Sequence, residues 1–187
     1  AFYRCGKLEQ ISWENLKEIG KEAFAGCTKL ETCCVRSVQS IGERAFAQTR
    51  WVEPTEGPFA VVGGIVVFGG GCAGEVCLPK HVTGIAPYAF AGNSRITKIV
   101  FSEGLAEIAE GAFSGCSALA DAVFPEGLQK IGARAFERCC SIKEVRTASP
   151  FVGASAFAGC RSLHTAVLSG VTVLEERTFA CCKELRA

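Results

Sequence analysis

A repeat of about 22 residues constrains this chain more than any other feature of its sequence. The dipeptide Ala-Phe, once replaced by Thr-Phe, recurs with its phenylalanine at Phe2, Phe24, Phe46, Phe90, Phe113, Phe136, Phe157 and Phe179. The longest interval, from Phe46 to Phe90, corresponds to two units, so the 187 residues hold about eight to nine units. Such a period is typical of solenoids, in which neighbouring units stack. We therefore predict one solenoid domain over residues 1–187.

Other columns of the repeat keep a fixed distance from the phenylalanine. Three residues after it the chain has Cys5, Cys27, Cys116, Cys139, Cys160 or Cys182, with Thr49 and Asn93 as exceptions. Five residues before it the chain has Ile19, Ile41, Ile85, Ile108, Ile131, Val152 or Leu174. No single unit can enclose its six or so apolar side chains, but stacked units bury them as continuous ladders. The segment Ile96–Phe101 is predicted as a short strand of one such unit.

The unit around Phe136 shows the full pattern, which reads Leu119, Ala122, Phe124, Pro125, Leu128, Ile131, Gly132, Ala135, Phe136 and Cys139. It resembles the leucine-rich repeats of the BspA-like, or Treponema pallidum-type, family. The resemblance implies an α/β repeat solenoid of right-handed curvature. A parallel β-sheet would line its concave side, and short strands with 3-10 or helical turns would form the other side. It also implies an exported or surface-attached protein of a bacterium or protist, and some similar proteins are adhesins for host matrix proteins.

One unit, near residues 54–81, departs from the pattern. Gly63 stands where the repeat has isoleucine, and Gly71 stands where it has cysteine. The stretch from Phe59 to Phe68 indicates two β-strands around Gly63-Gly64, because two glycines supply the positive φ angles of a tight hairpin. We expect an inserted hairpin at 59–68, which either projects as a binding element or sets a bend in the solenoid.

Composition excludes several classes of protein. With 49% hydrophobic and 21% charged residues the chain is not intrinsically disordered. A net charge of +1 gives no electrostatic reason to bind nucleic acid or an anionic membrane. The uncharged run from Gly57 to Gly74 contains seven glycines and one proline, so we predict no membrane-spanning helix.

The sequence carries no recognisable catalytic or cofactor-binding motif. The two histidines, His81 and His164, lie in no nucleophile–base pattern, and the carboxylates are scattered singly. We predict no enzyme, no catalytic residue, no cofactor and no metal site. Half of the twelve cysteines fall in the repeat column, where they fit as small buried side chains. Cys72 and Cys77 flank a loop and leave open a local bridge or a small-ligand or metal site.

Function is expected on the outward columns of the concave sheet, seven, eight and ten residues after each phenylalanine. The predicted contact residues are Thr97, Lys98, Val100, Ala120, Asp121, Val123, Glu144, Arg146, His164, Thr165 and Val167. An acidic group, Glu9, Glu31, Glu53 and Glu56, is predicted at the N-terminal end of the same face. The valines form an exposed apolar patch in this register, whereas a slip by one residue would turn them inward.

The leading hypothesis is a non-enzymatic protein-binding module that attaches to host components such as extracellular matrix. The first alternative is a self-assembling module that forms homo-oligomers through its ends or its apolar patch, because neither end of the sequence shows a polar capping segment. The second alternative is ligand or metal binding at Cys72 and Cys77. The family resemblance favours export, although the many cysteines leave a cytoplasmic location open.

Overall fold

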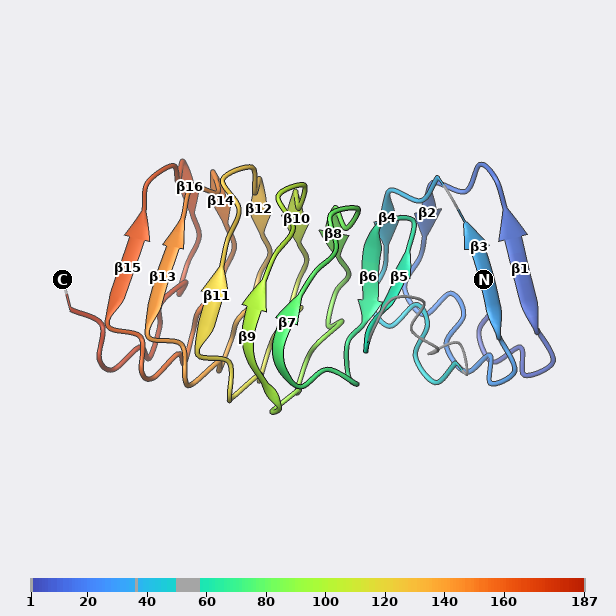
Figure 1. The fold of residues 1–187 in the computed structure, drawn as a ribbon, viewed down its shortest axis with the longest axis horizontal. Coiled ribbons are helices and arrows are strands. Elements are labelled where there is room, and N and C mark those ends of the chain that lie inside the picture. Colours follow the sequence, from blue (N-terminus) through green and yellow to red (C-terminus); the bar gives the residue numbers. More distant parts are fainter. Residues whose placement is uncertain (1, 36, 50–57, 187) are drawn as a thin grey trace.

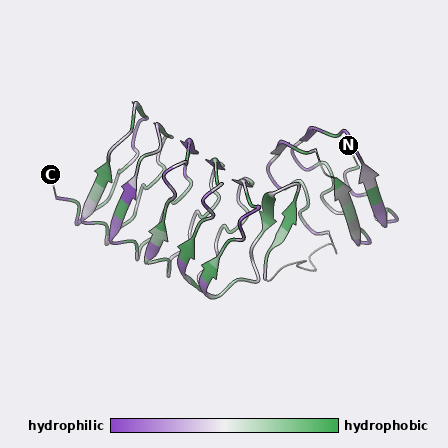
Figure 2. Ribbon diagram, turned by 45° about the horizontal axis from the view of Figure 1, so that its top comes forward, coloured by the Kyte–Doolittle hydropathy of each residue, from purple (hydrophilic) through white to green (hydrophobic). Residues whose placement is uncertain are grey.

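The chain folds into a β-solenoid, with two rows of strands running along its length (Figure 1). The structure, a computed structural model, describes residues 2–35, 37–49 and 58–186. Hydrophobic residues colour much of the strands, and polar residues occur both on strands and in turns (Figure 2). This arrangement confirms a repeat solenoid, because each unit outside the irregular one contributes one strand to each row and the apolar columns meet between the rows.

The first row, which we call the long-strand face, contains the strands predicted to line the concave side. Its strands are β1 (Gln10–Trp13), β3 (Thr32–Val35), β7 (Gly74–Cys77), β9 (Ile96–Val100), β11 (Asp121–Val123), β13 (Glu144–Thr147) and β15 (Thr165–Leu168). The second row contains β2 (Glu18–Ile19), β4 (Ser40–Ile41), β6 (Ile65–Phe68), β8 (Gly84–Ile85), β10 (Glu107–Ile108), β12 (Lys130–Ile131), β14 (Phe151–Val152) and β16 (Val173–Leu174). Among these strands every bonded pair is parallel, as predicted for the first row, and the hairpin adds one antiparallel pair.

The predicted hairpin is confirmed. Strand β5 (Ala60–Val62) pairs antiparallel with β6, and the Gly63-Gly64 turn between them has positive φ angles of 55° and 82°. Strand β6 then pairs parallel with β8, so β5 becomes the end of a seven-stranded sheet in the second row. The hairpin therefore separates the first two units, whose strands form the sheets β1-β3 and β2-β4, from the rest of the solenoid.

A ladder of stacked phenylalanine rings runs through the core. Phe90, Phe113, Phe136 and Phe157 are almost fully buried, and their ring centroids are 4.7, 5.1 and 5.2 Å apart in succession. The ladder stops at Phe68, whose side chain is 42% exposed. The core accordingly divides into two clusters, and the hairpin contributes to both, with Val66 in the larger cluster and Val62 in the N-terminal one.

The cysteine column forms a second ladder beside the rings. Cys116, Cys139 and Cys160 are fully buried, and each donates its S–H to a carbonyl of the preceding unit, that of Phe90, Phe113 and Phe136 respectively, at 3.1–3.2 Å. Burial raises the pKa of the Cys160 thiol to about 12. The prediction of small buried cysteines is therefore confirmed inside the solenoid, whereas Cys5 and Cys182 near its ends are exposed and half-buried.

The predicted helical turns are not seen, since the described residues contain no helix. The segment around Phe136 instead forms successive hydrogen-bonded turns, including Glu137 N–H to the Arg134 carbonyl at 3.1 Å. Residues two before and two after the phenylalanine, here Arg134 and Arg138, have φ angles of 55° and 59°. A right-handed helix requires negative φ at every residue, so these alternating left-handed positions prevent one. The fold is thus built from strands and turns rather than being of the α/β class.

Candidate protein-binding face

The predicted outward register of the long-strand face matches the structure. Ile99, Ala122 and Val145 point into the core, while Val123 and Val167 are 47% and 38% exposed. A slip by one residue would have reversed these positions. All the predicted contact residues of the C-terminal units are exposed or half-buried, namely Thr97, Lys98, Val100, Ala120, Asp121, Val123, Glu144, Arg146, His164, Thr165 and Val167.

Strand pairing brings these side chains together in rows across the face. Val100 lies opposite Val123, and Lys98 lies opposite Asp121. Lys98 Nζ also pairs with Glu75 Oε1 at 3.2 Å. The result is an apolar row next to a row of alternating charge, a combination that suits a protein surface with its own apolar and charged groups.

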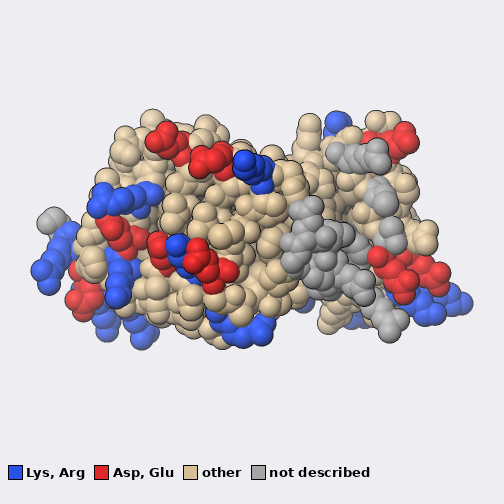
Figure 3. All heavy atoms as spheres, viewed as in Figure 1, with Lys and Arg blue, Asp and Glu red and all other residues tan. Residues whose placement is uncertain are grey.

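Farther toward the C-terminus the face is more polar. Arg146 forms an ion pair with Glu144 of the same strand, and His164 Nδ1 lies 3.0 Å from Thr165 Oγ1. His164, Thr165 and Lys143 line a shallow hollow of about 940 Å³. Figure 3 shows charged groups of both signs over this end of the molecule. The face therefore offers hydrogen-bonding and charged groups beside the valines.

At the N-terminal end Glu9 and Glu31 are exposed, in agreement with the predicted acidic group. Their backbones are neighbours, because the Glu31 N–H donates to the Glu9 carbonyl at 2.8 Å. The other two members, Glu53 and Glu56, lie outside the described residues. The structure thus places two exposed glutamates in neighbouring units at this end.

The residues considered for metal or ligand binding do not converge. Cys72 is fully buried, with its Sγ 3.4 Å from the Pro58 carbonyl, while Cys77 is exposed on β7. Neither forms a disulfide. No group of three His, Cys, Asp or Glu side chains in the described part of the chain is arranged to hold a metal ion. No helix of the described residues is long and apolar enough to cross a membrane.

Two residues of this face were missed by the sequence analysis. Glu75 and Cys77 on β7 occupy the same rows as Lys98 and Val100, their strand partners. Both belong to the unit of Phe68, whose ring lies outside the phenylalanine ladder. Counting forward from Phe68 with the offsets of the other units therefore gives the wrong position for strand β7. Counting backward from the next unit would have found them, because the parallel register continues from β9 to β7.

Comparison with known families agrees with the stacked architecture. The family model described as the BspA type leucine-rich repeat region matches residues 1–57 and 67–186, in six copies. The chain belongs to this BspA-type family. The gap in the match covers most of the hairpin, the segment in which the repeat pattern is lost. No curated protein sequence matches the chain.

Several solved bacterial structures share the fold of this chain. A leucine-rich cell surface protein from Faecalibacterium prausnitzii has a TM-score of 0.61 and 21% identity, over 99% of this chain and 60% of the other. A leucine-rich repeat protein from Eubacterium ventriosum has a TM-score of 0.61 and 17% identity, over 90% and 68%. The pneumococcal vaccine antigen PcpA has a TM-score of 0.56 and 21% identity, over 88% and 56%. The chain thus spans less than two thirds of the length of PcpA and of the F. prausnitzii protein.

Proposed function

We propose that this chain is a non-enzymatic protein-binding module that holds its partner on the long-strand face. The observation that carries the proposal is the row of half-buried Val100 and exposed Val123 beside alternating charges, since monomeric proteins seldom expose contiguous apolar patches without a contact role. The face is broad and shallow, which suits a protein better than a small molecule. Its central residues are Val100, Val123, Lys98 and Asp121.

Adhesion to host components is the more specific form of this proposal. It is supported by the family membership and by two structural neighbours, one titled a cell surface protein and the other a vaccine antigen. The same neighbours support an exported location for this chain. An exported adhesin would meet extracellular matrix proteins, which makes these the first partners to test.

The test is surface plasmon resonance against a panel of purified extracellular matrix proteins, with Val123→Glu as the face variant. Val173→Glu is the matched control, because Val173 is an equally exposed valine, 46% against 47%, on β16 of the other row. We expect Val123→Glu to abolish binding and Val173→Glu to preserve it. Equal loss in both variants would refute the assignment of this face, and no binding to any matrix protein would refute adhesion.

Self-assembly is a second candidate, favoured by the apolar side chains that the long-strand face leaves exposed. Val123 and Val167 are 47% and 38% exposed, and a second copy of the chain could cover them. Sedimentation equilibrium over a wide concentration range tests it. An assembling module shows a mass above 19.8 kDa that falls with dilution, whereas a strict monomer excludes this function.

A further inference from the structure

One column of the long-strand face changes its charge along the solenoid. It lies seven residues after each repeat phenylalanine, and all the members named here are exposed. In chain order they are Glu9, Glu31, Thr97, Ala120, Lys143, His164 and Arg186. The column is therefore acidic toward the N-terminus, uncharged in the middle and basic toward the C-terminus. We call Lys143, His164 and Arg186 the basic row.

Backbone hydrogen bonds show that the basic row crosses three neighbouring units. The His164 N–H donates to the Lys143 carbonyl at 3.0 Å, and the Arg186 N–H donates to the His164 carbonyl at 3.5 Å. Neighbouring strands lie about 4.8 Å apart, so Lys143 and Arg186 are separated by about two such spacings. The three side chains line the shallow hollow described above together with the hydroxyl groups of Ser162 and Thr165. Figure 3 shows lysine and arginine side chains gathered at this end of the molecule.

The charges of the basic row are not neutralised by neighbouring carboxylates. Elsewhere on the face Lys98 pairs with Glu75, and Arg146 pairs with Glu144. Within the described part of the chain, no member of the basic row forms an ion pair. Glu184 also lines the hollow, and its carboxylate is likewise in no ion pair there. Because like charges on neighbouring strands repel, an acidic ligand would stabilise this arrangement.

We propose that the basic row binds the carboxylates of an acidic segment of a partner protein. This inference rests on the proposed function, and it names the chemistry of the partner at one end of the face. Alternate side chains of an extended segment point the same way and lie about 6.6–6.8 Å apart, between one and two strand spacings. Carboxylates on two alternate residues can therefore reach the row together. The Arg186 guanidinium can hold one of them through two parallel hydrogen bonds.

The surroundings of the row favour a protein segment over a sulfated glycan or a nucleic acid. Glu144 and Glu184 lie beside the row, so a chain with a negative charge on nearly every unit would place some of its charges against them. A peptide can instead direct a few carboxylates at the row and keep its other side chains uncharged. Val167 on β15 is 38% exposed and offers an apolar contact two residues from Thr165. The net charge of +1 likewise gives a polyanion no general attraction to the chain.

The probe is the acetylated and amidated peptide Gly-Glu-Gly-Glu-Gly, with Gly-Gln-Gly-Gln-Gly as its uncharged control. Each is titrated into ¹⁵N-labelled protein while the backbone amide signals are followed by NMR, which detects weak binding. We expect saturable shifts at Lys143, His164 and Arg186 with the glutamate peptide only. No shifts at these residues, or equal shifts with both peptides, would overturn the proposal. The probe has no apolar side chain and does not need the valines, so this test and the matrix-binding test can fail separately.

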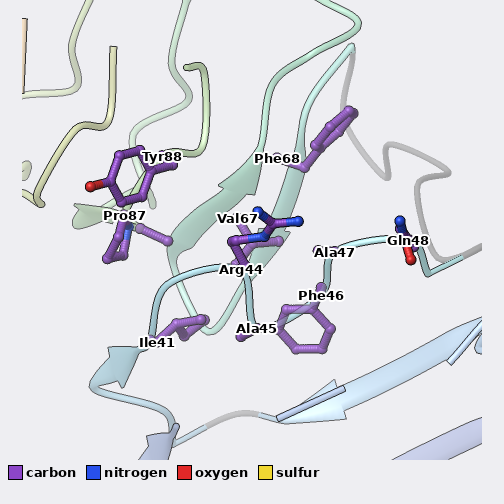
Figure 4. Close-up of a pocket in the computed structure, with 12 residues that line it drawn as sticks. Ile41, Arg44, Ala45, Phe46, Ala47, Gln48, Val67, Phe68, Pro87 and Tyr88 are labelled. Atoms are coloured by element: carbon purple, nitrogen blue, oxygen red, sulfur yellow. The ribbon is translucent and has the colours of Figure 1, made fainter. Parts of the chain in front are cut away.

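A double variant, Lys143→Gln with Arg186→Gln, tests whether the row itself supplies the binding. The control is Arg44→Gln, which removes an exposed guanidinium from another hollow, of about 250 Å³, whose walls include Val67 and Phe68. Figure 4 shows the Arg44 side chain in that hollow, extending from its turn toward β6. We expect the double variant to weaken binding of the glutamate peptide about tenfold and Arg44→Gln to leave it unchanged. All three side chains are exposed, so these variants should fold.

Two outcomes would overturn the proposal even if the peptide binds. Equal weakening in the double variant and in Arg44→Gln would show that the peptide binds any exposed cation. The second concerns a sulfated disaccharide with the same charge as the peptide. If it binds the row more tightly than the peptide does, and the double variant weakens that binding, the row is a glycan site instead.

Discussion

Asn93 provides a sharp test of how the irregular unit is held to the solenoid. It stands in the column that elsewhere holds cysteine, so a rule based on the repeat would regard Asn93→Cys as a restoration. The structure predicts the opposite. The Asn93 Nδ2 donates to the carbonyls of Gly69 and Cys72 at 3.0 Å, and Oδ1 accepts from the N–H groups of Arg95 and Ile96.

The size of the effect depends on what each partner would lose. Gly69 O retains a bond from Cys72 N–H at 3.1 Å, and the exposed Arg95 N–H can be hydrated. Outside the sheet ladders, no other bond within the described residues reaches the Ile96 N–H or the Cys72 carbonyl, and Ile96 is fully buried. Leaving two such groups unsatisfied costs about 1–3 kcal/mol each, so Asn93→Cys should destabilise the protein by roughly 2–6 kcal/mol.

Urea unfolding followed by far-ultraviolet circular dichroism measures this difference, with Cys116→Ser as a conservative control in the same column. Cys116 makes one S–H bond, to the Phe90 carbonyl, which a serine hydroxyl can replace. We expect a small change for Cys116→Ser and a large one for Asn93→Cys. An Asn93→Cys protein as stable as the wild type would refute the assignment of Asn93 as the bridge between units.

Three further predictions concern the core. Phe136→Ala should lower the free energy of unfolding by about 3–5 kcal/mol, because the Phe136 ring is fully buried between two stacked neighbours. Phe2→Ala, at an exposed ring, should lower it much less, and urea unfolding of both variants measures the difference. Gly69→Ala should destabilise the protein by about 2 kcal/mol or more in the same assay, because its Cβ would lie 2.0 Å from the buried Phe90 ring. The free energy of unfolding should fall above pH 9, the ordinary pKa of a thiol, because burial keeps Cys160 protonated in the folded state up to about pH 12. Between pH 7 and pH 10 the wild type should lose roughly 1.4 kcal/mol more stability than Cys160→Ala. Parallel curves of stability against pH for the two proteins would contradict this.

The regular part of the fold could be predicted from the sequence because each column repeats many times. Once the ladder of Phe113, Phe136 and Phe157 is recognised, the alternation of Ile99 and Val100 fixes which side of the strand is buried. The hairpin was also predictable, since Gly63-Gly64 between two apolar runs is a strong local signal. Repetition and local turn chemistry thus account for most of the architecture.

The features that the sequence could not reveal depend on particular neighbours. Helical turns were expected from the family resemblance, yet non-glycine residues such as Arg134 and Arg138 adopt left-handed φ angles, which no column of the repeat reveals. Glu75 was missed because its position on the face follows from its strand pairing with Lys98 and not from its distance to the phenylalanine of its own unit.

This dependence on neighbours explains why an irregular unit is a natural place for a site in a solenoid. In a regular array each unit satisfies the donors of the unit before it, so the interior of the array offers little that a ligand could bind. A unit that folds differently interrupts that array. Here the hairpin completes the second row through β6 and β8, but the ring of Phe68 leaves the phenylalanine ladder. The same change therefore divides the core into two clusters and leaves an aromatic ring of the hairpin exposed.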